Sequence, residues 1–251
     1  MTVQVLVATM NQDDHDLVAK MNIQTSAIVA NQCSTNSVEE FYFQDNKITY
    51  LNFNETGVGL NRNNALIRAD ADICLIADDD LTYLNDYEAL VKKAYYDYPK
   101  ADFIIFNLIE KDSARYVIKR PTKVSYFNFL RYGTARFSFR LDAIRNNSIC
   151  FNQNFGGGTS HSHGEDNIFL FQCLKSNLNV IAVPVALAVL NEDRESTWHR
   201  TYDEKYFKDQ GILYKTMFKK TWRLFCFQDS VRHSKSYGKS WINSYRAMTR
   251  T

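Results

Sequence analysis

The sequence contains little glycine or proline and no long hydrophobic run. Its 251 residues include 9 glycines and 3 prolines, a composition that argues against disorder. No window reaches the ~18 apolar residues that a membrane span needs. The opening residues, MTVQVLVATM, lack the basic region of a signal peptide and have the pattern of a strand. We therefore expect a folded chain without a signal peptide or a transmembrane segment.

Cysteine is also scarce, and its spacing excludes the common zinc and disulfide motifs. The cysteines are odd in number and form no CxxC pair. Reduced thiols fit a cytoplasmic protein better than a secreted one, so we expect a cytoplasmic location. The five residues are Cys33, Cys74, Cys150, Cys173 and Cys226.

Charge is nearly balanced overall but unevenly distributed. The net charge is +2, with 45% hydrophobic and 23% charged residues, which is ordinary for a globular protein with a sizeable core. Residues 212–251 hold nine Lys or Arg and one Asp, so the rest of the chain is acidic. We expect a domain over 1–211, in halves 1–112 and 113–211, and a basic, aromatic, helical extension over 212–251.

Apolar runs alternate with helical repeats along the first half of the chain. This alternation predicts an α/β fold with a mostly parallel sheet. After residue 112 it loosens, and Pro184 favours an edge strand or an irregular segment. We predict strands over 3–9, 26–32, 47–53, 72–77 and 102–109, helices over 13–23, 60–69, 87–98 and 165–177, a strand then a helix over 135–144, an extended segment over 179–190, and helices over 202–250.

Three consecutive aspartates, Asp78, Asp79 and Asp80, directly follow the apolar run CLIA. Ligands of open α/β sheets bind beyond the carboxyl ends of the strands, where these residues should lie. Strand alternation places Asp78 and Asp80 on one side and Asp79 on the other. Two carboxylates can share a divalent cation with phosphate oxygens and water. The alternative is that the aspartates only cap the following turn or helix.

Four segments, in order along the chain, resemble those of family 2 glycosyltransferases with the GT-A fold. VLVATMNQ takes the place of the first strand and nucleotide-binding turn, and ETGVGLNRNNAL resembles G-x-x-x-x-R-N-x-A/G-L. LIADDDLTY resembles the D-x-D element, and GGGTSHSHGEDNIFL the glycine-rich acceptor loop with its E-D pair. Together with ESTWHRTYDEKYFKDQG, the resemblance is greatest to bacterial capsule and exopolysaccharide transferases, over residues 3 to about 215.

This resemblance implies a Rossmann-like, mixed but mostly parallel sheet flanked by helices, with a helical C-terminal extension. It implies inverting transfer from a nucleoside diphosphate sugar, with UDP expected, and Mn²⁺ or Mg²⁺ as cofactor. The implied acceptor is a saccharide linked to polyprenyl diphosphate, in surface polysaccharide biosynthesis. The family often ends its second strand with an Asp that reads the base. Here the turn is ANQCST, and Asn31 could replace that Asp because an amide donates and accepts.

Site roles follow from the resemblance residue by residue. We expect Asp166 as the base that deprotonates the acceptor, with Glu165 orienting the acceptor or the loop. Expected nucleotide contacts are Thr9, Asn11, Asn31, Arg62, Asp78 and Asp79; metal ligands are Asp80 and Asp78, with His199 as a further ligand; acceptor contacts are Gly157, Gly158, His163 and Trp198.

Each role has a plainer alternative. Arg62 could be a surface residue of its helix, and Glu165 and Asp166 could only cap theirs. The pair His161 and His163 has the spacing of zinc ligands, but no third and fourth ligands are suitably placed, so loop residues facing donor or acceptor fit better. In the segment STWHR, the alternatives are a packed core tryptophan and a surface histidine.

The segment ILYKTMFKKTWRLFCF, residues 212–227, has apolar residues at helical spacing with Lys and Arg between them. Such a segment can lie on the inner face of the cell membrane as a peripheral anchor. The alternative is a helix packed on the main domain. Nucleic-acid binding is disfavoured, because the rest of the chain is acidic.

Two other functions share parts of this pattern. A sugar-phosphate nucleotidyltransferase usually has a glycine- and arginine-rich loop after its first strand, and here that place holds TMNQDDHD. The other is a catalytically inactive GT-A domain that acts as a scaffold in a polysaccharide complex. The presence of Asp78, Asp80 and Asp166 argues against the scaffold.

Overall fold

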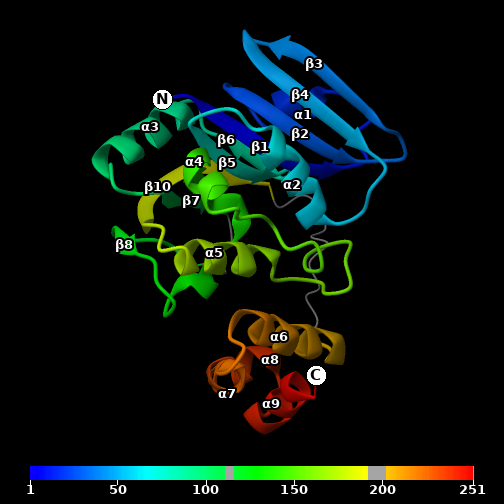
Figure 1. Cartoon of the computed structure of the whole chain (residues 1–251), viewed down its shortest axis with the longest axis vertical. Helices are drawn as coiled ribbons and strands as arrows, with labels where there is room; N and C mark the ends of the chain where they lie inside the picture. Colours follow the sequence, from blue (N-terminus) through cyan, green and yellow to red (C-terminus); the bar gives the residue numbers. More distant parts are fainter. Residues whose placement is uncertain (111–115, 192–201, 251) are drawn as a thin grey trace.

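The computed structural model describes residues 1–110, 116–191 and 202–250 (Figure 1). Its strands are β1 (Val3–Met10), β2 (Ser26–Gln32), β3 (Ser37–Phe43), β4 (Asn46–Phe53), β5 (Ile73–Asp78), β6 (Leu81–Tyr83), β7 (Phe103–Ile109), β8 (Thr122–Lys123), β9 (Phe137–Arg140) and β10 (Val180–Leu190). Its helices are α1 (Asp16–Lys20), α2 (Val58–Arg68), α3 (Tyr87–Asp97), α4 (Leu141–Asn146), α5 (Glu165–Lys175), α6 (Glu204–Met217), α7 (Trp222–Arg232), α8 (Ser234–Tyr237) and α9 (Trp241–Thr249).

The described strands form one mixed sheet in the order β3-β4-β2-β1-β5-β9-β7-β10-β6, with β8 also paired to β10. Strands β4, β2, β1 and β5 run parallel to one another, and β10 runs parallel to β7. Between β5 and β7, β9 is antiparallel to both. The predicted GT-A class, a mostly parallel sheet flanked by helices, is therefore confirmed.

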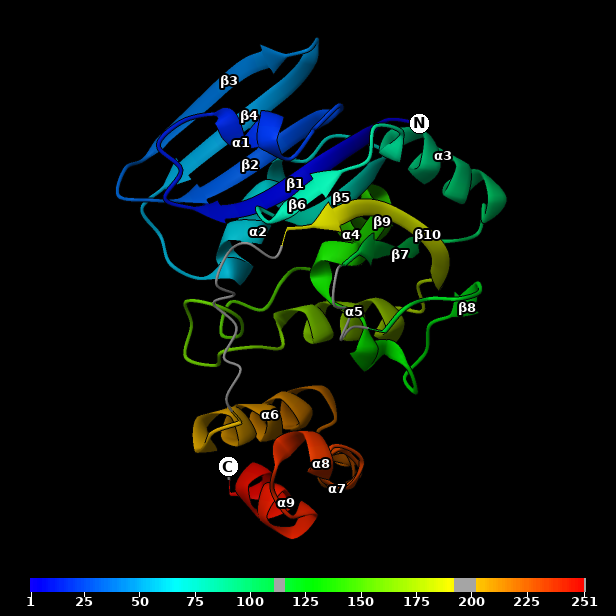
Figure 2. The ribbon, with the colours of Figure 1, turned by 180° about the vertical axis from the view of Figure 1, so that it is seen from behind.

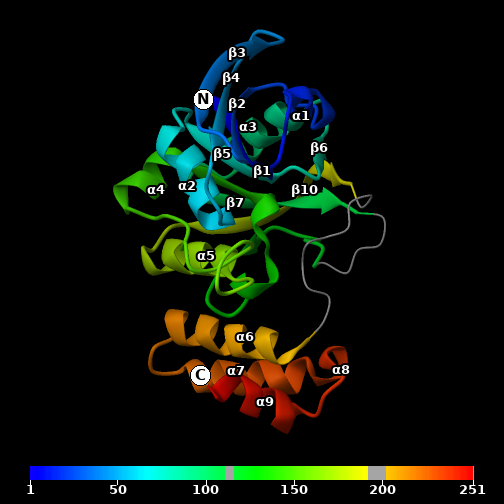
Figure 3. The ribbon, with the colours of Figure 1, turned by 90° about the vertical axis from the view of Figure 1, so that its right-hand side faces the viewer.

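Alternate residues of β1 enter two different cores. Val5 and Val7 pack with residues of α1 and α3 on one face of the sheet. Leu6 packs with residues of α2, α4 and α5 on the other face. A strand buried on both faces must be apolar throughout, which explains the unbroken run in its sequence. Figures 2 and 3 show the sheet between these helical layers.

The pattern missed the short strands β6 and β8 and the longer strand β3, and it misplaced the ends of one helix. Strand β3 forms an antiparallel hairpin with β4 through Gln44 and Asp45, which have φ of 48° and 65°. Most of its residues are exposed, so it lacks the hydrophobic signal on which the prediction depended. Helix α1 covers only Asp16–Lys20 of the predicted 13–23.

Strand β10 is a paired strand, although Pro184 suggested an edge or an irregular segment. Its pairing with β7 shifts register between Ala182 and Ala186, so the proline falls in the irregularity that the sequence predicted. The other side pairs with β8 at Ile181 and Ala182 and with β6 from Ala188 onward, so Pro184 interrupts neither ladder.

Helices α6, α7, α8 and α9 form a compact C-terminal unit below the sheet domain in Figure 1. The predicted boundary between residues 211 and 212 falls inside α6, so α6 belongs to this unit as a whole. The basic amphipathic segment 212–227 is divided between the end of α6 and the start of α7, with Phe218–Thr221 between them. All five cysteines are free thiols.

Candidate active site

The carboxyl ends of β1 and β5 lie side by side, because Ala8 of β1 is in register with Asp78 of β5. Asp78 is the last residue of its strand, and Asp79 and Asp80 form the turn that follows, so strand alternation does not extend to them. The hydroxyl of Thr9 donates to the Asp79 carboxylate at 2.6 Å. The backbone carbonyl of Asp80 accepts from the amide of Asn191 at 2.8 Å. The three aspartates therefore follow one another at one edge of the sheet.

Arg62 joins this edge to the start of α5. It is 3% exposed, so the surface alternative is wrong. One terminal nitrogen donates to Asp78 Oδ1 at 2.6 Å and the other to Glu165 Oε1 at 2.8 Å. Burial works against its charge, but Asp78 and Glu165 hold the pKa of Arg62 above its usual value. A permanently charged, planar fork suits a bridge between two carboxylates.

Glu165 and Asp166 occupy the first turn of α5. Burial and the neighbouring Glu165 charge raise the pKa of Asp166 to about 7. The Asp166 carboxylate accepts from both the backbone and the side-chain amide of Asn167, at 2.7 and 2.6 Å. A carboxylate whose pKa lies near neutrality can take up and release a proton, as a general base requires. Asp166 is therefore a buried carboxyl group with a raised pKa, and the neighbouring Glu165 is paired with Arg62.

The segment before α5, residues 155–164, is here called the glycine loop. Its Gly157 carbonyl accepts from the Val58 amide at the start of α2, at 3.0 Å. Gly156 has a φ of 98°, and a Cβ there would lie 2.7 Å from Glu165 Oε2, so only glycine fits. Gly158 also has positive φ, at 78°. The glycines thus let the loop pass closely between α2 and Glu165.

The two histidines of the glycine loop face α6. His161 Nδ1 lies 3.0 Å from Asp209, and His163 Nε2 lies 2.8 Å from Gln210. Burial lowers the pKa of His163 below its ordinary value. Within the described residues, no group of three or more His, Cys, Asp and Glu could hold a metal, so a zinc site at this pair is not supported. The His163 side chain contacts α6, and its predicted contact with the acceptor stays a prediction.

Other predicted site residues have different positions. The side chain of Asn31 is fully buried, donates to the Gln12 carbonyl and to Asn52, and accepts from the Gln12 amide. It therefore shapes the turn after β1, in which Asn11 has a φ of 53° and is exposed. Trp198 and His199 lie outside the described residues.

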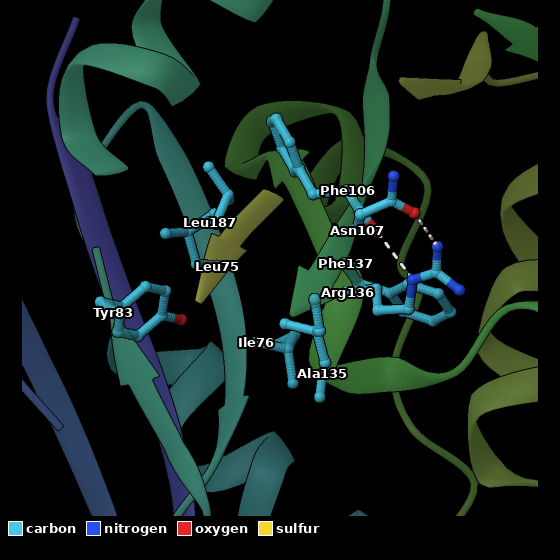
Figure 4. Close-up of a pocket in the computed structure, with 10 residues that line it drawn as sticks. Leu75, Ile76, Tyr83, Phe106, Asn107, Ala135, Arg136, Phe137 and Leu187 are labelled. Carbon is cyan, nitrogen blue, oxygen red and sulfur yellow. Dashed lines mark hydrogen bonds between the residues drawn. The ribbon is translucent and has the colours of Figure 1, made fainter. Parts of the chain in front are cut away.

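A small cavity lies between β5 and β7, where β9 no longer joins them (Figure 4). Leu75 and Phe106 contribute to its mostly apolar lining. The Arg136 side chain donates to Asn107 Oδ1 at 2.8 Å and to the Phe106 carbonyl at 2.7 Å. Sequence reasoning did not single out this buried arginine, because neither its spacing nor its neighbours form a motif. The aspartates do not line the cavity, so it is separate from the carboxylate cluster.

The sheet order and the carboxylates at the ends of its strands define the GT-A class. A family model described as glycosyl transferase family 2 matches residues 15–161, and the chain belongs to this family. No curated protein matches the chain. Within the described residues, no helix combines the length and the apolar character needed to cross a bilayer.

Several solved structures share the fold. The S. aureus TarS 1–349 complex with UDP-GlcNAc has a TM-score of 0.65 and 14% identity, covering 100% of this chain and 91% of that chain. The TarS 1–349 complex with UDP has a TM-score of 0.60 and 16% identity, covering 85% and 64%. The mannosyltransferase PcManGT from Pyrobaculum calidifontis, with GDP-Man and Mn²⁺, has a TM-score of 0.55 and 14% identity, covering 86% and 64%. Identities this low show the fold alone.

Proposed function

We propose that the protein is an inverting glycosyltransferase that moves a sugar from a nucleoside diphosphate sugar to a saccharide acceptor. The central supporting observation is the buried Arg62 bridge, which joins Asp78 at the end of β5 to Glu165 beside Asp166. It links the expected donor edge of the sheet to the expected base. Family membership and the fold of nucleotide-sugar-bound neighbours support the same reaction.

The donor nucleotide is expected along the carboxyl ends of β1 and β5. Thr9, Asn11, Asp78 and Asp79 border this edge, and Asn31 supports the turn that carries Asn11. We propose UDP as the nucleotide, because TarS, bound to UDP-GlcNAc, gives the highest TM-score of the structures named above. We expect Arg62 to act chiefly through Asp78 and Glu165, because one terminal nitrogen donates to each of them.

Asp80 and Asp78 would hold Mn²⁺ or Mg²⁺. Asp78 Oδ1 accepts a hydrogen bond from Arg62, and the Asp78 side chain is 31% exposed. The two aspartates can therefore offer a cation only a few carboxylate oxygens. Such a donor set fits a hard cation that takes its remaining ligands from phosphate and water. When bound, the cation would neutralise charge on the departing diphosphate.

Asp166 would remove the proton from the acceptor hydroxyl. The acceptor oxygen then forms a bond to the anomeric carbon, and the bond from that carbon to the diphosphate oxygen breaks, which inverts the anomeric configuration. The proton goes to Asp166 and the electron pair to the nucleoside diphosphate. Gly157 and Gly158 are exposed in the glycine loop and would contact the acceptor.

We further propose a lipid-linked acceptor at the inner face of the cell membrane, in surface polysaccharide biosynthesis. All nine Lys and Arg of residues 212–251 are exposed, whereas the single acid, Asp229, is buried against the Tyr237 hydroxyl. Leu224, Phe227 and Val231 are exposed on α7, and Phe227 meets Trp241 of α9 at 5.7 Å between ring centroids. An apolar stripe with basic surroundings suits an anionic membrane surface.

The test is release of nucleoside diphosphate from a panel of UDP-, GDP- and dTDP-sugars, with and without Mn²⁺. Wild-type protein should release diphosphate from at least one donor, and Asp166→Asn should not. If the protein neither binds nor cleaves any donor, its assignment as a glycosyltransferase is overturned. The catalytically inactive scaffold would then be the better explanation. Formation of a nucleoside diphosphate sugar from a sugar phosphate would favour the nucleotidyltransferase.

A further inference from the structure

One face of α6 contacts almost every residue that leads into the expected catalytic carboxylates. Tyr206, Asp209, Gln210 and Leu213 recur at the spacing of one helix face and are here called the α6 stripe. Opposite them lie His161, Ser162, His163 and Gly164, the last four residues of the glycine loop. Glu165 and Asp166 follow directly.

Asp209 is the polar centre of the α6 stripe. It is buried, and its carboxylate accepts from the Ser162 amide at 3.0 Å and the Ser162 hydroxyl at 3.1 Å. It also lies 3.0 Å from His161 Nδ1 and 2.6 Å from Lys205 Nζ. Burial alone would raise the pKa of Asp209, but the hydrogen bonds from Lys205, His161 and Ser162 outweigh it and lower the pKa to about 2. The carboxylate is therefore ionised at neutral pH.

The flanking contacts fix the rest of the segment. The Gln210 side-chain oxygen can only accept, so His163 Nε2 donates to it at 2.8 Å. The His163 ring stacks on Tyr206 with centroids 4.8 Å apart. Gly164 has a φ of 107°, and a Cβ there would lie 2.7 Å from Leu213. Backbone, ring and packing contacts thus determine where the loop turns into α5.

A helix that only needed to attach to the main domain could do so through apolar contacts. Desolvating a carboxylate is costly unless it is well paired, and here its pairing is directed at the glycine loop. The same loop is held on its other side by the Gly157 carbonyl and Val58. Asp166 therefore follows a segment fixed between α2 and α6.

We propose that Asp209, with Gln210, is a positioning residue for the transfer reaction: the C-terminal helical unit sets the position of Asp166 through the glycine loop. This rests on the proposed function of Asp166 as the base. A displacement of a reacting group by about 1 Å can cost on the order of a hundredfold in rate. Nucleotide binding should be insensitive, because the expected nucleotide edge at β1 and β5 is separate from α6.

The experiment compares Asp209→Ala, Asp209→Asn and Gln210→Ala with Asp203→Ala. Asp203 caps the same helix by accepting from the Tyr206 amide at 2.7 Å, and among the described residues it forms no hydrogen bond or ion pair with the glycine loop. We expect kcat to fall by roughly ten- to a hundredfold in Asp209→Ala, with partial rescue in Asp209→Asn and an unchanged UDP dissociation constant. Hydrogen exchange over residues 156–164 should accelerate in Asp209→Ala and not in Asp203→Ala.

Equal losses of kcat in Asp209→Ala and Asp203→Ala would overturn the proposal, because helix stability would then explain both. Unchanged kcat in all loop-facing variants would overturn it as well. If Asp209→Ala does not fold, Gln210→Ala and Asp209→Asn provide the same comparison. Wild-type protein that binds no donor would count against the proposed function alone. In that case, unchanged exchange over 156–164 in Asp209→Ala would still refute the positioning role.

Discussion

Arg62 and Glu165 are 103 residues apart in the sequence, yet their side chains meet at 2.8 Å in the interior of the protein. Because Arg62 also binds Asp78, one guanidinium sets the relative positions of a strand end and a helix start. Arg62→Ala would leave two carboxylates near each other without their shared cation. Breaking a buried ion pair in this way typically costs about 3–5 kcal/mol.

We therefore expect Arg62→Ala to lower the free energy of unfolding by about that amount and to abolish transfer. Arg62→Lys should be less destabilised but still impaired, because an ammonium cannot reproduce the fork. Urea denaturation measures the stability, with Arg68→Ala, an exposed residue of the same helix, as control. Equal stability of the Arg62→Ala and Arg68→Ala proteins would contradict the bridge.

The raised pKa of Asp166 predicts opposite effects of pH on activity and stability. Because the folded protein holds this proton up to about pH 7, whereas the unfolded chain releases it near the ordinary value for Asp, the contribution of Asp166 to stability falls as pH rises between those values. Over the same window the ionised base accumulates, so kcat/KM should rise with pH through about 7.

Asp166→Asn, which should be inactive, should lose the pH effect on stability, whereas Asp142→Asn, at an exposed acid of α4, should retain both effects. Steady-state kinetics and thermal unfolding from about pH 5 to about pH 8 measure the two profiles. A kcat/KM that is flat across this range in wild-type protein would argue against titration of the base.

Asp80→Ala should abolish the activity that depends on a divalent cation. We expect loss of diphosphate release by a factor on the order of a hundred or more, because charge on the leaving group is no longer neutralised. Asp86→Ala changes an exposed acid only six positions away and serves as control. Chelator-treated wild-type protein with full activity would show that the reaction proceeds without the cation.

Gly156→Ala should destabilise the folded protein, since its backbone has a φ of 98° and its Cβ would meet Val58 and Glu165 at 2.5–2.8 Å. Strain of this kind costs about 1–3 kcal/mol. Gly157→Ala is a matched control for stability, because a Cβ there meets nothing within 4 Å. Thermal unfolding that shows equal midpoints for the two variants would mean that the loop adapts.

Membrane association should depend on the basic surface of the C-terminal unit. Substitution of Lys219, Lys220 and Arg223 by Glu should strongly weaken binding to anionic vesicles. Each basic residue near such a surface contributes about 1 kcal/mol to the binding free energy. Sedimentation with vesicles rich in phosphatidylglycerol measures this, with phosphatidylcholine vesicles and Lys93→Glu of α3 as controls. Wild-type protein that does not sediment with either lipid would refute the membrane contact.

The sequence pattern predicted the strands and helices in which apolar residues recur regularly. The runs in β1, β5 and β7 are apolar throughout because both faces of the sheet are covered, and the repeat in α5 continues for three turns. Strand β3 escaped prediction because its residues are mostly exposed and its pairing depends on the hairpin turn. The side-chain directions of Asp79 and Asp80 could not be predicted from strand alternation, because β5 ends at Asp78.

The sequence by itself determined the family, the alternation of strands and helices, and the presence of carboxylates after β5 and at the start of α5, because these are local properties of consecutive residues. Only the tertiary structure decided that Arg62 is shared between the two carboxylate groups and that His161 and His163 turn toward α6. Contacts between residues tens of positions apart depend on how packed layers meet, and no spacing along the chain records that.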